Sequence, residues 1–301
     1  MKTLLNILSA ALLLACALPA QAALNVFACE PEWAALVQEL AGDKASVYAA
    51  TNALQDPHRV DARPSLIAKA RRAQLVVCTG AELETAWLPV ILREAGNPDV
   101  APGKPGYFEA ASQVAMREVP SRLDRAEGDI HPFGNPHIQL DARNFLPIAQ
   151  ALTQRLAALD PANAATYRAR LDTFSQKWRE ALLRWEKQAA PLKGVAIVVQ
   201  HKAFPYLEAW LGMKEVAALE PKPGMEPSAA YLSQLVGQLQ QHPAKMILRA
   251  GYQSPKSSDW LAERTQLKIV TLSFSVGGSD AAKDLFGLFD DTLARLLAGL
   301  K

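Results

Sequence analysis

Three of the five histidines in the chain occupy places where ligand chemistry is possible. His58 and His137 each follow a proline in a turn, and His201 directly follows an apolar run that predicts a strand. In open α/β sheets, ligands bind at the edge where strands lead into helices, so residues distant in sequence can converge there. A preceding proline stiffens the backbone that presents an imidazole. Imidazole nitrogens suit Zn²⁺ and suit the hard ions Mg²⁺ and Ca²⁺ poorly, so the three histidines predict a zinc-type site.

Carboxylates near these histidines are candidates for a fourth ligand, or for hydrogen-bond acceptors that orient the rings. The candidates are Asp56, Asp141 and Asp280. Asp280 lies in a Gly-rich loop, where its alternative role is to cap the last helix. His131 lies in the irregular segment 101–136, which is expected to contain exposed loop, and is either an accessory metal ligand or an exposed loop residue. His242 ends a surface helix and is expected to be structural or solvated.

The elements that must position these residues form two series of strands and helices. Short apolar or β-branched runs alternate with amphipathic stretches, a pattern typical of strand-helix-strand units and a mainly parallel sheet. We therefore expect an α/β fold of two lobes, each a mainly parallel sheet flanked by helices. In the first series the expected strands are 25–28, 46–50 and 74–78, and the expected helices are 31–41, 64–72 and 81–94. In the second series the expected strands are 195–200, 216–219, 246–250 and 268–272, and a last helix covers about 281–300.

A long helical pattern separates the two series. From Pro161 to Pro191, aromatic and leucine side chains recur at spacings of three and four, and the two prolines mark its first turn and its end. At about 1.5 Å per residue, such a helix would run along the side of both lobes. We expect an N-terminal lobe at 23–160, a linking helix at 161–191 and a C-terminal lobe at 192–301; a long helix packed on one lobe only is the alternative. The sequence has no flexible Gly/Ser hinge, so large closure of the lobes is not expected.

The first 22 residues have the features of a cleavable signal peptide. Lys2 precedes an apolar stretch that ends in Ala20-Gln21-Ala22, the small-x-small pattern recognised by signal peptidase. Export to the periplasm is therefore expected, with residues 1–22 removed. Leu13-Leu14-Ala15-Cys16 resembles a lipobox, so lipid anchoring at Cys16 is the alternative.

Two cysteines would remain after removal of the signal, in a compartment that permits disulfides. Cys29 and Cys78 each follow an apolar run. If those runs are neighbouring parallel strands, their carboxyl ends lie side by side and the sulfurs can meet. A disulfide is therefore expected, and two buried free thiols are the alternative. A metal role is disfavoured because the pair lacks partner cysteines at zinc-site spacing.

Length and composition exclude several classes of function. The chain has 301 residues, half of them hydrophobic, and a formal net charge of +2. This composition is typical of a globular protein, and the length suggests about two domains. The small net charge and the lack of a Lys/Arg run argue against nucleic acid as a partner. The sequence contains no His-Glu-x-x-His, Gly-x-Ser-x-Gly, P-loop or dinucleotide-binding pattern, so an enzyme is not expected.

A series of short segments extends over essentially the whole mature chain. They are Gln55-Asp56-Pro57-His58, Arg63-Pro64-Ser65, Leu75-Val76-Val77-Cys78-Thr79-Gly80, Glu82-Leu83-Glu84, Gly134-Asn135-Pro136-His137-Ile138-Gln139-Leu140-Asp141, His201-Lys202-Ala203-Phe204-Pro205-Tyr206-Leu207 and Glu226-Pro227-Ser228. In this order they resemble the zinc/manganese-type (cluster A-I) periplasmic metal-binding proteins of ABC importers, and within them the zinc subgroup.

The resemblance implies two α/β lobes joined by a rigid helix, a metal ion in the cleft, and delivery of that ion to an ABC-transporter membrane permease. By motif, the three histidine ligands of the family correspond to His58, His137 and His201. The third position is His or Glu in different members, and His here favours Zn²⁺ over Mn²⁺ as the transported ion. The Asp that family members often have directly after the last strand is not at the matching place, which leaves Asp280 or a water molecule as fourth ligand. A monomeric, high-affinity zinc-binding protein is expected.

Three other functions remain open at this point. A periplasmic zinc metallochaperone would hand the ion to another protein, and a binding protein of the same fold could carry a solute other than a metal. A zinc hydrolase would also use three histidines and a water molecule, but it should show a carboxylate placed as general base.

Overall fold

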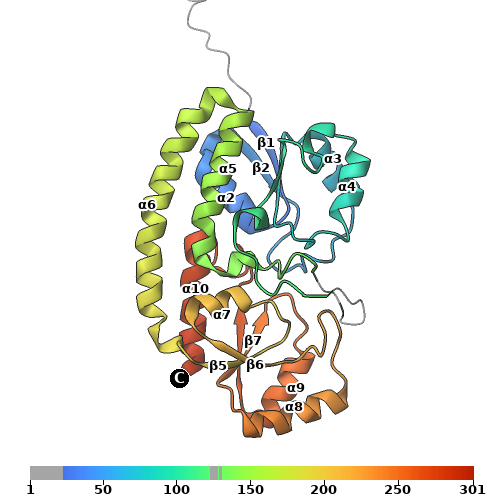
Figure 1. Ribbon diagram of the computed structural model, residues 1–301, viewed down its shortest axis with the longest axis vertical. Coiled ribbons are helices and arrows are strands. Elements are labelled where there is room, and N and C mark those ends of the chain that lie inside the picture. Colours follow the sequence, from blue (N-terminus) through green and yellow to red (C-terminus); the bar gives the residue numbers. More distant parts are fainter. Residues whose placement is uncertain (1–22, 123–127, 129–130) are drawn as a thin grey trace, which may run out of the picture.

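A computed structural model describes residues 23–122, 128 and 131–301. The expected signal peptide at 1–22 and Cys16 lie outside the described residues. Two sheets, each flanked by helices, lie one above the other in Figure 1, and a long helix runs along one side of both. Among the described residues, no helix combines the length and the apolar character needed to cross a membrane.

The first half of the molecule contains a parallel four-stranded sheet. Its strands are β1 Leu24–Ala28, β2 Ala45–Ala49, β3 Leu75–Cys78 and β4 Tyr107–Glu109, and its helices are α2 Pro31–Ala41, α3 Pro64–Arg72, α4 Leu88–Ala95 and α5 Phe145–Leu159. The strand order is β2-β1-β3-β4. Successive strand residues face opposite sides of a sheet, so Val26 packs in the cluster that includes α2 and α5, whereas Phe27 packs with α3 and α4. Helices cover both faces, which explains why β3 is buried at every position.

The second half repeats this arrangement. Its strands are β5 Ala196–Val199, β6 Lys214–Ala218, β7 Met246–Ala250 and β8 Lys268–Leu272, and its helices are α7 Pro205–Leu211, α8 Ala229–Gln241, α9 Lys256–Thr265 and α10 Leu285–Leu300. All strands are parallel, in the order β6-β5-β7-β8. Ile197 packs in the cluster that includes α7 and α10, whereas Val198 packs with α8 and α9. The expected fold class, two parallel sheets flanked by helices, is confirmed.

A long helix joins the two halves. The 3-10 turn Pro161–Asn163 runs directly into α6, Ala164–Gln188, and a second 3-10 turn, Ala190–Leu192, follows. The helix lies beside both halves in Figure 1 and packs against α2, α5 and α10. The pattern at 161–191 therefore corresponds to one long helix with a 3-10 turn at each end.

One continuous hydrophobic core runs through both halves. Trp178 and Trp185 of α6 are fully buried, and their ring centroids lie 5.6 and 5.2 Å from that of Phe289 in α10. Phe289 also contacts Trp210 of α7, at 5.5 Å. Aromatic pairs contribute about 0.5–1.5 kcal/mol each beyond the burial of their area. Phe289 also lies 5.7 Å, centroid to centroid, from Phe145 of α5 in the first half, and rotation of one half against the other would break this pair.

Two helices begin later than expected. α4 begins at Leu88 rather than at 81, because Ala81 and Glu82 have φ of 51° and 66°, which a right-handed helix cannot accommodate. α10 begins at Leu285 rather than at 281. Its N-cap is Asp284, whose carboxylate accepts a hydrogen bond from the backbone N–H of Gly287 at 2.7 Å. The alternative role of Asp280 as the helix cap is therefore wrong.

The segment 101–136 contains more structure than its composition predicts. β4 lies within it and pairs with β3, but three residues are too few to give a periodic signal. Beyond this segment, His137 is the N-cap of the 3-10 turn Ile138–Leu140 and lies well before α5. Two 3-10 turns, Ile138–Leu140 and Ala142–Asn144, lie between it and α5.

Candidate metal centre

The structure brings His58, His137 and His201 together. Each offers one ring nitrogen, and these nitrogens all lie within 4.8 Å of one another. The ring centroids are 5.3 Å apart for His58 and His137, 5.5 Å for His137 and His201, and 5.8 Å for His58 and His201. His58 lies in the loop after β2, His201 lies just after β5, and His137 lies between β4 and α5. Both halves of the molecule therefore contribute to the cluster.

The tripeptides Asp56-Pro57-His58 and Asn135-Pro136-His137 fold alike. In each, the side-chain Oδ1 of the first residue accepts a hydrogen bond from the backbone N–H of the histidine, at 3.0 and 3.1 Å. The same oxygen lies 2.9 and 2.8 Å from Nδ1 of that histidine. Neither an ionised carboxylate nor an amide oxygen can donate, so each neutral ring carries its proton on Nδ1. Nε2 then keeps its lone pair for a metal ion.

Glu220 provides the acceptor for the Nδ1 atom of His201. Its Oε2 lies 2.7 Å from Nδ1 of His201 and also accepts a hydrogen bond from the backbone N–H of Gly224 at 2.8 Å. Glu220 follows β6, which pairs with β5, so this bond joins the ends of neighbouring strands. All three rings thus have an acceptor on Nδ1, an arrangement common among metal-bound histidines because it fixes both the ring and its tautomer.

The cluster contains buried nitrogen atoms that lack a partner. Nε2 of His58 and Nε2 of His137 are buried and make no hydrogen bond within the part of the chain that the structure describes. His137 is only 1% exposed. Burial, and then the neighbouring histidines, lower the pKa of His137 well below its usual value, so its ring is neutral. An unpaired buried polar atom is costly, and a metal ion bonded to both nitrogens removes that cost. The donor set therefore fits a divalent transition-metal ion.

The carboxylates around the rings favour a cation. Burial raises the pKa of Asp56, but the hydrogen bond and the charge of His58 outweigh this effect, and the pKa lies below its ordinary value. Glu220 provides a second carboxylate at His201. Two carboxylates therefore lie beside the three imidazoles, and their negative charge favours a divalent cation at this place.

His131 and Asp280 differ in their relation to the cluster. The ring of His131 lies 5.4 Å, centroid to centroid, from that of His58. Asp280 is exposed in the loop between β8 and α10 and does not belong to the group of converging ligand atoms. His242 is exposed at the end of α8. Of these three residues, only His131 is placed beside the cluster.

Two pockets border the histidine cluster, so it does not lie in a sealed core. One has a volume of about 360 Å³ and is lined among others by His131, Asn135, His137 and His201. The other has a volume of about 240 Å³ and is lined among others by Asp56, His58, His201 and Glu220.

Cys29 and Cys78 form a disulfide, as expected. β1 and β3 are parallel neighbours, and the two cysteines meet at the carboxyl end of this strand pair. Their sulfurs and the carboxylate of Glu84 form another group of possible ligand atoms among the described residues. The metal-binding form of cysteine is the thiolate, which a disulfide lacks, so this group is not a metal site in the oxidised protein.

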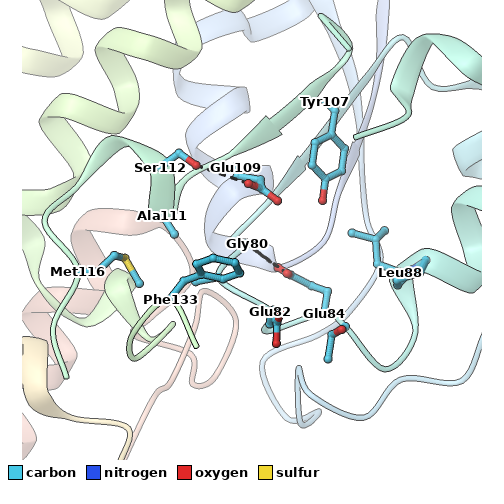
Figure 2. A pocket seen from close by; sticks show the side chains of 13 residues that line it. Gly80, Glu82, Glu84, Leu88, Tyr107, Glu109, Ala111, Ser112, Met116 and Phe133 are labelled. Carbon is cyan, nitrogen blue, oxygen red and sulfur yellow. Dashed lines mark hydrogen bonds between the residues drawn. The ribbon is translucent and has the colours of Figure 1, made fainter. Parts of the chain in front are cut away.

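A further pocket, of about 420 Å³, lies in the first half and contains no histidine. Figure 2 shows Glu84, Glu109, Tyr107 and Phe133 around it. The carboxylate of Glu84 accepts hydrogen bonds from the backbone N–H groups of Thr79 and Gly80, at 2.8 and 3.1 Å, and burial raises its pKa to about 7. Glu84 thus stabilises the turn that precedes α4, and we assign the metal centre to the histidine cluster instead.

Three side chains accept a hydrogen bond from Nδ1 of a histidine, and only one of them is among the carboxylates that the sequence suggested. Asp56 bonds to His58, but the expected Asp141 pairs with Arg143, at 2.7 Å. The signal for Asn135 is the repetition of Asx-Pro-His in the sequence. Glu220 has no local signal, because it lies 19 residues from His201 and reaches it only through the pairing of β5 with β6.

The fold and the site together define a class of protein: an α/β metal-binding protein whose two halves, joined by one long helix, both supply histidines to one site. Residues 26–299 match the family described as zinc-uptake complex component A, periplasmic (ZnuA), and the chain belongs to this family.

Individual relatives are distant. The high-affinity zinc uptake system protein ZnuA of Bacillus subtilis (strain 168) is 24% identical over 268 residues, which are 88% of this chain and 82% of that protein. The manganese ABC transporter substrate-binding lipoprotein scaA of Streptococcus gordonii is 27% identical over 157 residues, 51% of this chain and 47% of that protein. The chain thus spans about half the length of some curated relatives that it matches. A crystal structure of ZnuA has the same fold, with a TM-score of 0.77 at 21% identity over 93% of this chain and 100% of that chain.

Proposed function

We propose that this chain is the extracytoplasmic solute-binding component of a metal ABC importer and that its cargo is Zn²⁺. The ion binds Nε2 of His58, His137 and His201 and is then delivered to an ABC-transporter membrane permease. The observation that supports this most strongly is the convergence of three imidazoles whose Nδ1 atoms all have acceptors. Membership in a family of zinc-uptake components supports the transport role.

The choice of Zn²⁺ over Mn²⁺ rests on the donor atoms. The relatives divide on this point, since the B. subtilis protein is named for zinc and the S. gordonii protein for manganese. In this chain the converging group consists of three imidazoles, with no carboxylate among its ligand atoms in the described residues. Imidazole suits zinc, whereas carboxylate and water oxygens suit manganese, and Zn²⁺ also binds a given site more tightly than Mn²⁺.

The proposed fourth ligand is His131 or a water molecule. Zinc is usually four-coordinate, with water as a common fourth ligand where three protein ligands are present. The ring of His131 lies beside that of His58, which supports His131 as a candidate. Asp280 stays a prediction, and its exposed place requires the loop between β8 and α10 to turn inward.

Several features of the wider proposal rest on the sequence. We propose a periplasmic location after removal of residues 1–22, with a lipid anchor at Cys16 as the alternative. The lobe boundaries at 23–160, 161–191 and 192–301 and the monomeric state stay predictions.

A zinc metallochaperone would use the same histidines, and dependence of zinc import on a partner permease separates the two functions. The zinc hydrolase is disfavoured because the family consists of uptake components.

The ion preference can be tested by titrating the metal-free protein with Zn²⁺ against a competing chelator, alone and with a large excess of Mn²⁺. We expect one Zn²⁺ per chain, retained in the presence of Mn²⁺. His201→Glu replaces one nitrogen donor by an oxygen donor, and it should narrow the preference for Zn²⁺ over Mn²⁺ by roughly tenfold or more. A wild-type protein that binds neither ion, or that exchanges Zn²⁺ for Mn²⁺, would show that the proposed cargo is wrong.

A further inference from the structure

The side chain of Asn135 connects the loops that carry two of the three histidines. Its Oδ1 accepts from the backbone N–H of His137 and from Nδ1 of the same residue, at 3.1 and 2.8 Å. Its Nδ2 donates to the backbone carbonyl of Lys202 at 2.7 Å and to the carboxylate of Glu118 at 3.0 Å. Lys202 directly follows His201 in the sequence. One buried amide, 9% exposed, thus bonds to a ligand histidine of the first half and to the backbone beside a ligand histidine of the second half.

The partners of Asn135 require an amide at this position. The backbone N–H of His137 can only donate and the carbonyl of Lys202 can only accept, which fixes the orientation of the amide group. An aspartate would keep the bonds to His137, but its other oxygen would face a carbonyl and a carboxylate with no hydrogen to share. Asp56 occupies the equivalent position in the first Asx-Pro-His tripeptide, and its hydrogen bonds go to His58. The two tripeptides therefore hold their histidines alike, but only the amide can also bridge to the other half.

The backbone of Asn135 is held across the same boundary. Its carbonyl accepts a hydrogen bond from the hydroxyl of Tyr206 in α7, at 2.8 Å. That hydroxyl in turn accepts from the backbone N–H of Arg117 at 3.0 Å, and the backbone N–H of Asn135 donates to the carbonyl of Arg117 at 2.8 Å. Side chain and backbone of Asn135 thus both connect the loop of His137 to the second half. Neither loop can move far without breaking one of these bonds.

We propose that Asn135 is a positioning residue that sets the separation of His137 and His201 and thereby slows release of the bound ion. This inference rests on the proposed function, because it concerns the same site and the same cargo. Without the bridge, the loop of His137 can move independently of the loop of His201. The coordination geometry would then be formed less often and lost more quickly. Removal of groups that orient metal ligands typically weakens metal affinity by about 10–100-fold.

Two variants of Asn135 and one matched control test the bridge. Asn135→Asp keeps the acceptor for His137 and removes the donor to Lys202, whereas Asn135→Ala removes both. Asn97→Asp makes the same chemical change beside the 3-10 turn Pro98–Val100, where the Asn97 amide donates to the carbonyls of Ala70 and Ala73 at 3.2 and 2.8 Å. For each full-length protein, the affinity for Zn²⁺ by chelator competition, the rate of zinc release and the thermal midpoint of the metal-free form are measured.

Both Asn135 variants should release zinc faster than the wild type, and Asn135→Ala, which also loses the acceptor for His137, should bind zinc about 10–100-fold more weakly. Asn97→Asp should lower the thermal midpoint and leave zinc affinity and release unchanged. A wild-type rate of zinc release from Asn135→Asp would overturn the bridge, because the acceptor for His137 alone would then be sufficient. Equal weakening by Asn97→Asp would also overturn it, since the effect would follow general stability. If the wild-type protein does not bind zinc, the proposed function and this inference are both wrong. If the wild type binds zinc and the Asn135 variants bind and release it as the wild type does, only this inference is wrong.

Discussion

The three histidines of the proposed metal centre differ in their contact with solvent. His137 is 1% exposed, whereas the side chains of His58 and His201 are 17% and 13% exposed. Burial is the largest cause of the low pKa of His137, and the charges of the neighbouring histidines lower it further. His137 therefore stays neutral in moderately acidic solution and keeps the lone pair on Nε2 available. Protons compete with the metal ion least at this residue.

Zinc affinity should fall as the pH falls, because a proton and the ion compete for the same nitrogen atoms. The usual pKa of histidine is about 6.5, and that of His137 lies well below it. At a pH about one unit below the usual value, three ordinary imidazoles would release nearly three protons per ion, whereas a neutral His137 releases none, so the count should be about two at most. Calorimetry in buffers of different ionisation enthalpy counts these protons. Affinity that stays constant far below the usual histidine pKa would exclude a histidine site, and release of nearly three protons about one unit below that value would exclude a neutral His137.

At the residue scale, the sequence predicts which histidines converge better than it predicts their hydrogen-bond partners. His58, His137 and His201 are identifiable because prolines and strand ends mark places where an α/β sheet presents ligands. Glu220 is not, because its contact with His201 depends on how β5 and β6 pair. The relative placement of His131 and Asp280 depends on loop conformations that no local sequence pattern determines.

At the element scale, a buried carboxylate joins α2 to the loop after β8. Glu32 of α2 is 2% exposed, and its Oε2 accepts a hydrogen bond from the hydroxyl of Ser275. Burial raises the pKa of Glu32 to about 7, although the bond from Ser275 acts in the opposite direction. This contact lies between the two halves. An ionised Glu32 there is a buried charge, which destabilises the folded state.

Glu32→Gln should stabilise the metal-free protein at alkaline pH. The folded-state pKa of about 7 lies above the ordinary value of 4.5, so the stability linked to this proton is complete below 4.5 and is lost as the pH rises through 7. Glutamine cannot ionise, so at pH above 7 the variant should have the larger free energy of unfolding, by on the order of 1 kcal/mol. Urea unfolding at acidic and alkaline pH measures the difference. The exposed Glu180 of α6 provides the control, Glu180→Gln. If Glu32→Gln changes the free energy of unfolding equally at both pH values, the pKa of Glu32 is not raised by burial.

Elements with long apolar patterns are the predictable ones. α2 and α3 have the expected bounds, and the pattern from 161 onward predicts the long helix. β4 is not predictable because its three residues become a strand only by pairing with β3. The start of α4 is not predictable because positive φ at Ala81 and Glu82 depends on a turn held by the buried carboxylate of Glu84.

At the scale of the whole molecule, the proposed metal centre lies where the two halves meet. The proposed ligands come from both halves, and one hydrophobic core runs through both. An ion bound by both halves therefore adds a further connection to a junction that is already packed. Binding to the folded state alone stabilises it by about 4 kcal/mol when the free ion is at a thousand times its dissociation constant.

The alternation of strands and helices predicts two parallel sheets, but the strand order depends on long-range packing.

A crystal of the zinc-loaded protein, measured on both sides of the zinc absorption edge, tests the central claim most directly. We expect one anomalous peak at the junction of the two halves, bonded at roughly 2.0–2.1 Å to Nε2 of His58, His137 and His201. The fourth position should hold His131 or a water molecule, and Asp56, Asn135 and Glu220 should still accept hydrogen bonds from the Nδ1 atoms. A zinc peak elsewhere, or one bonded to fewer than all three of these histidines, would contradict the assignment of the metal centre.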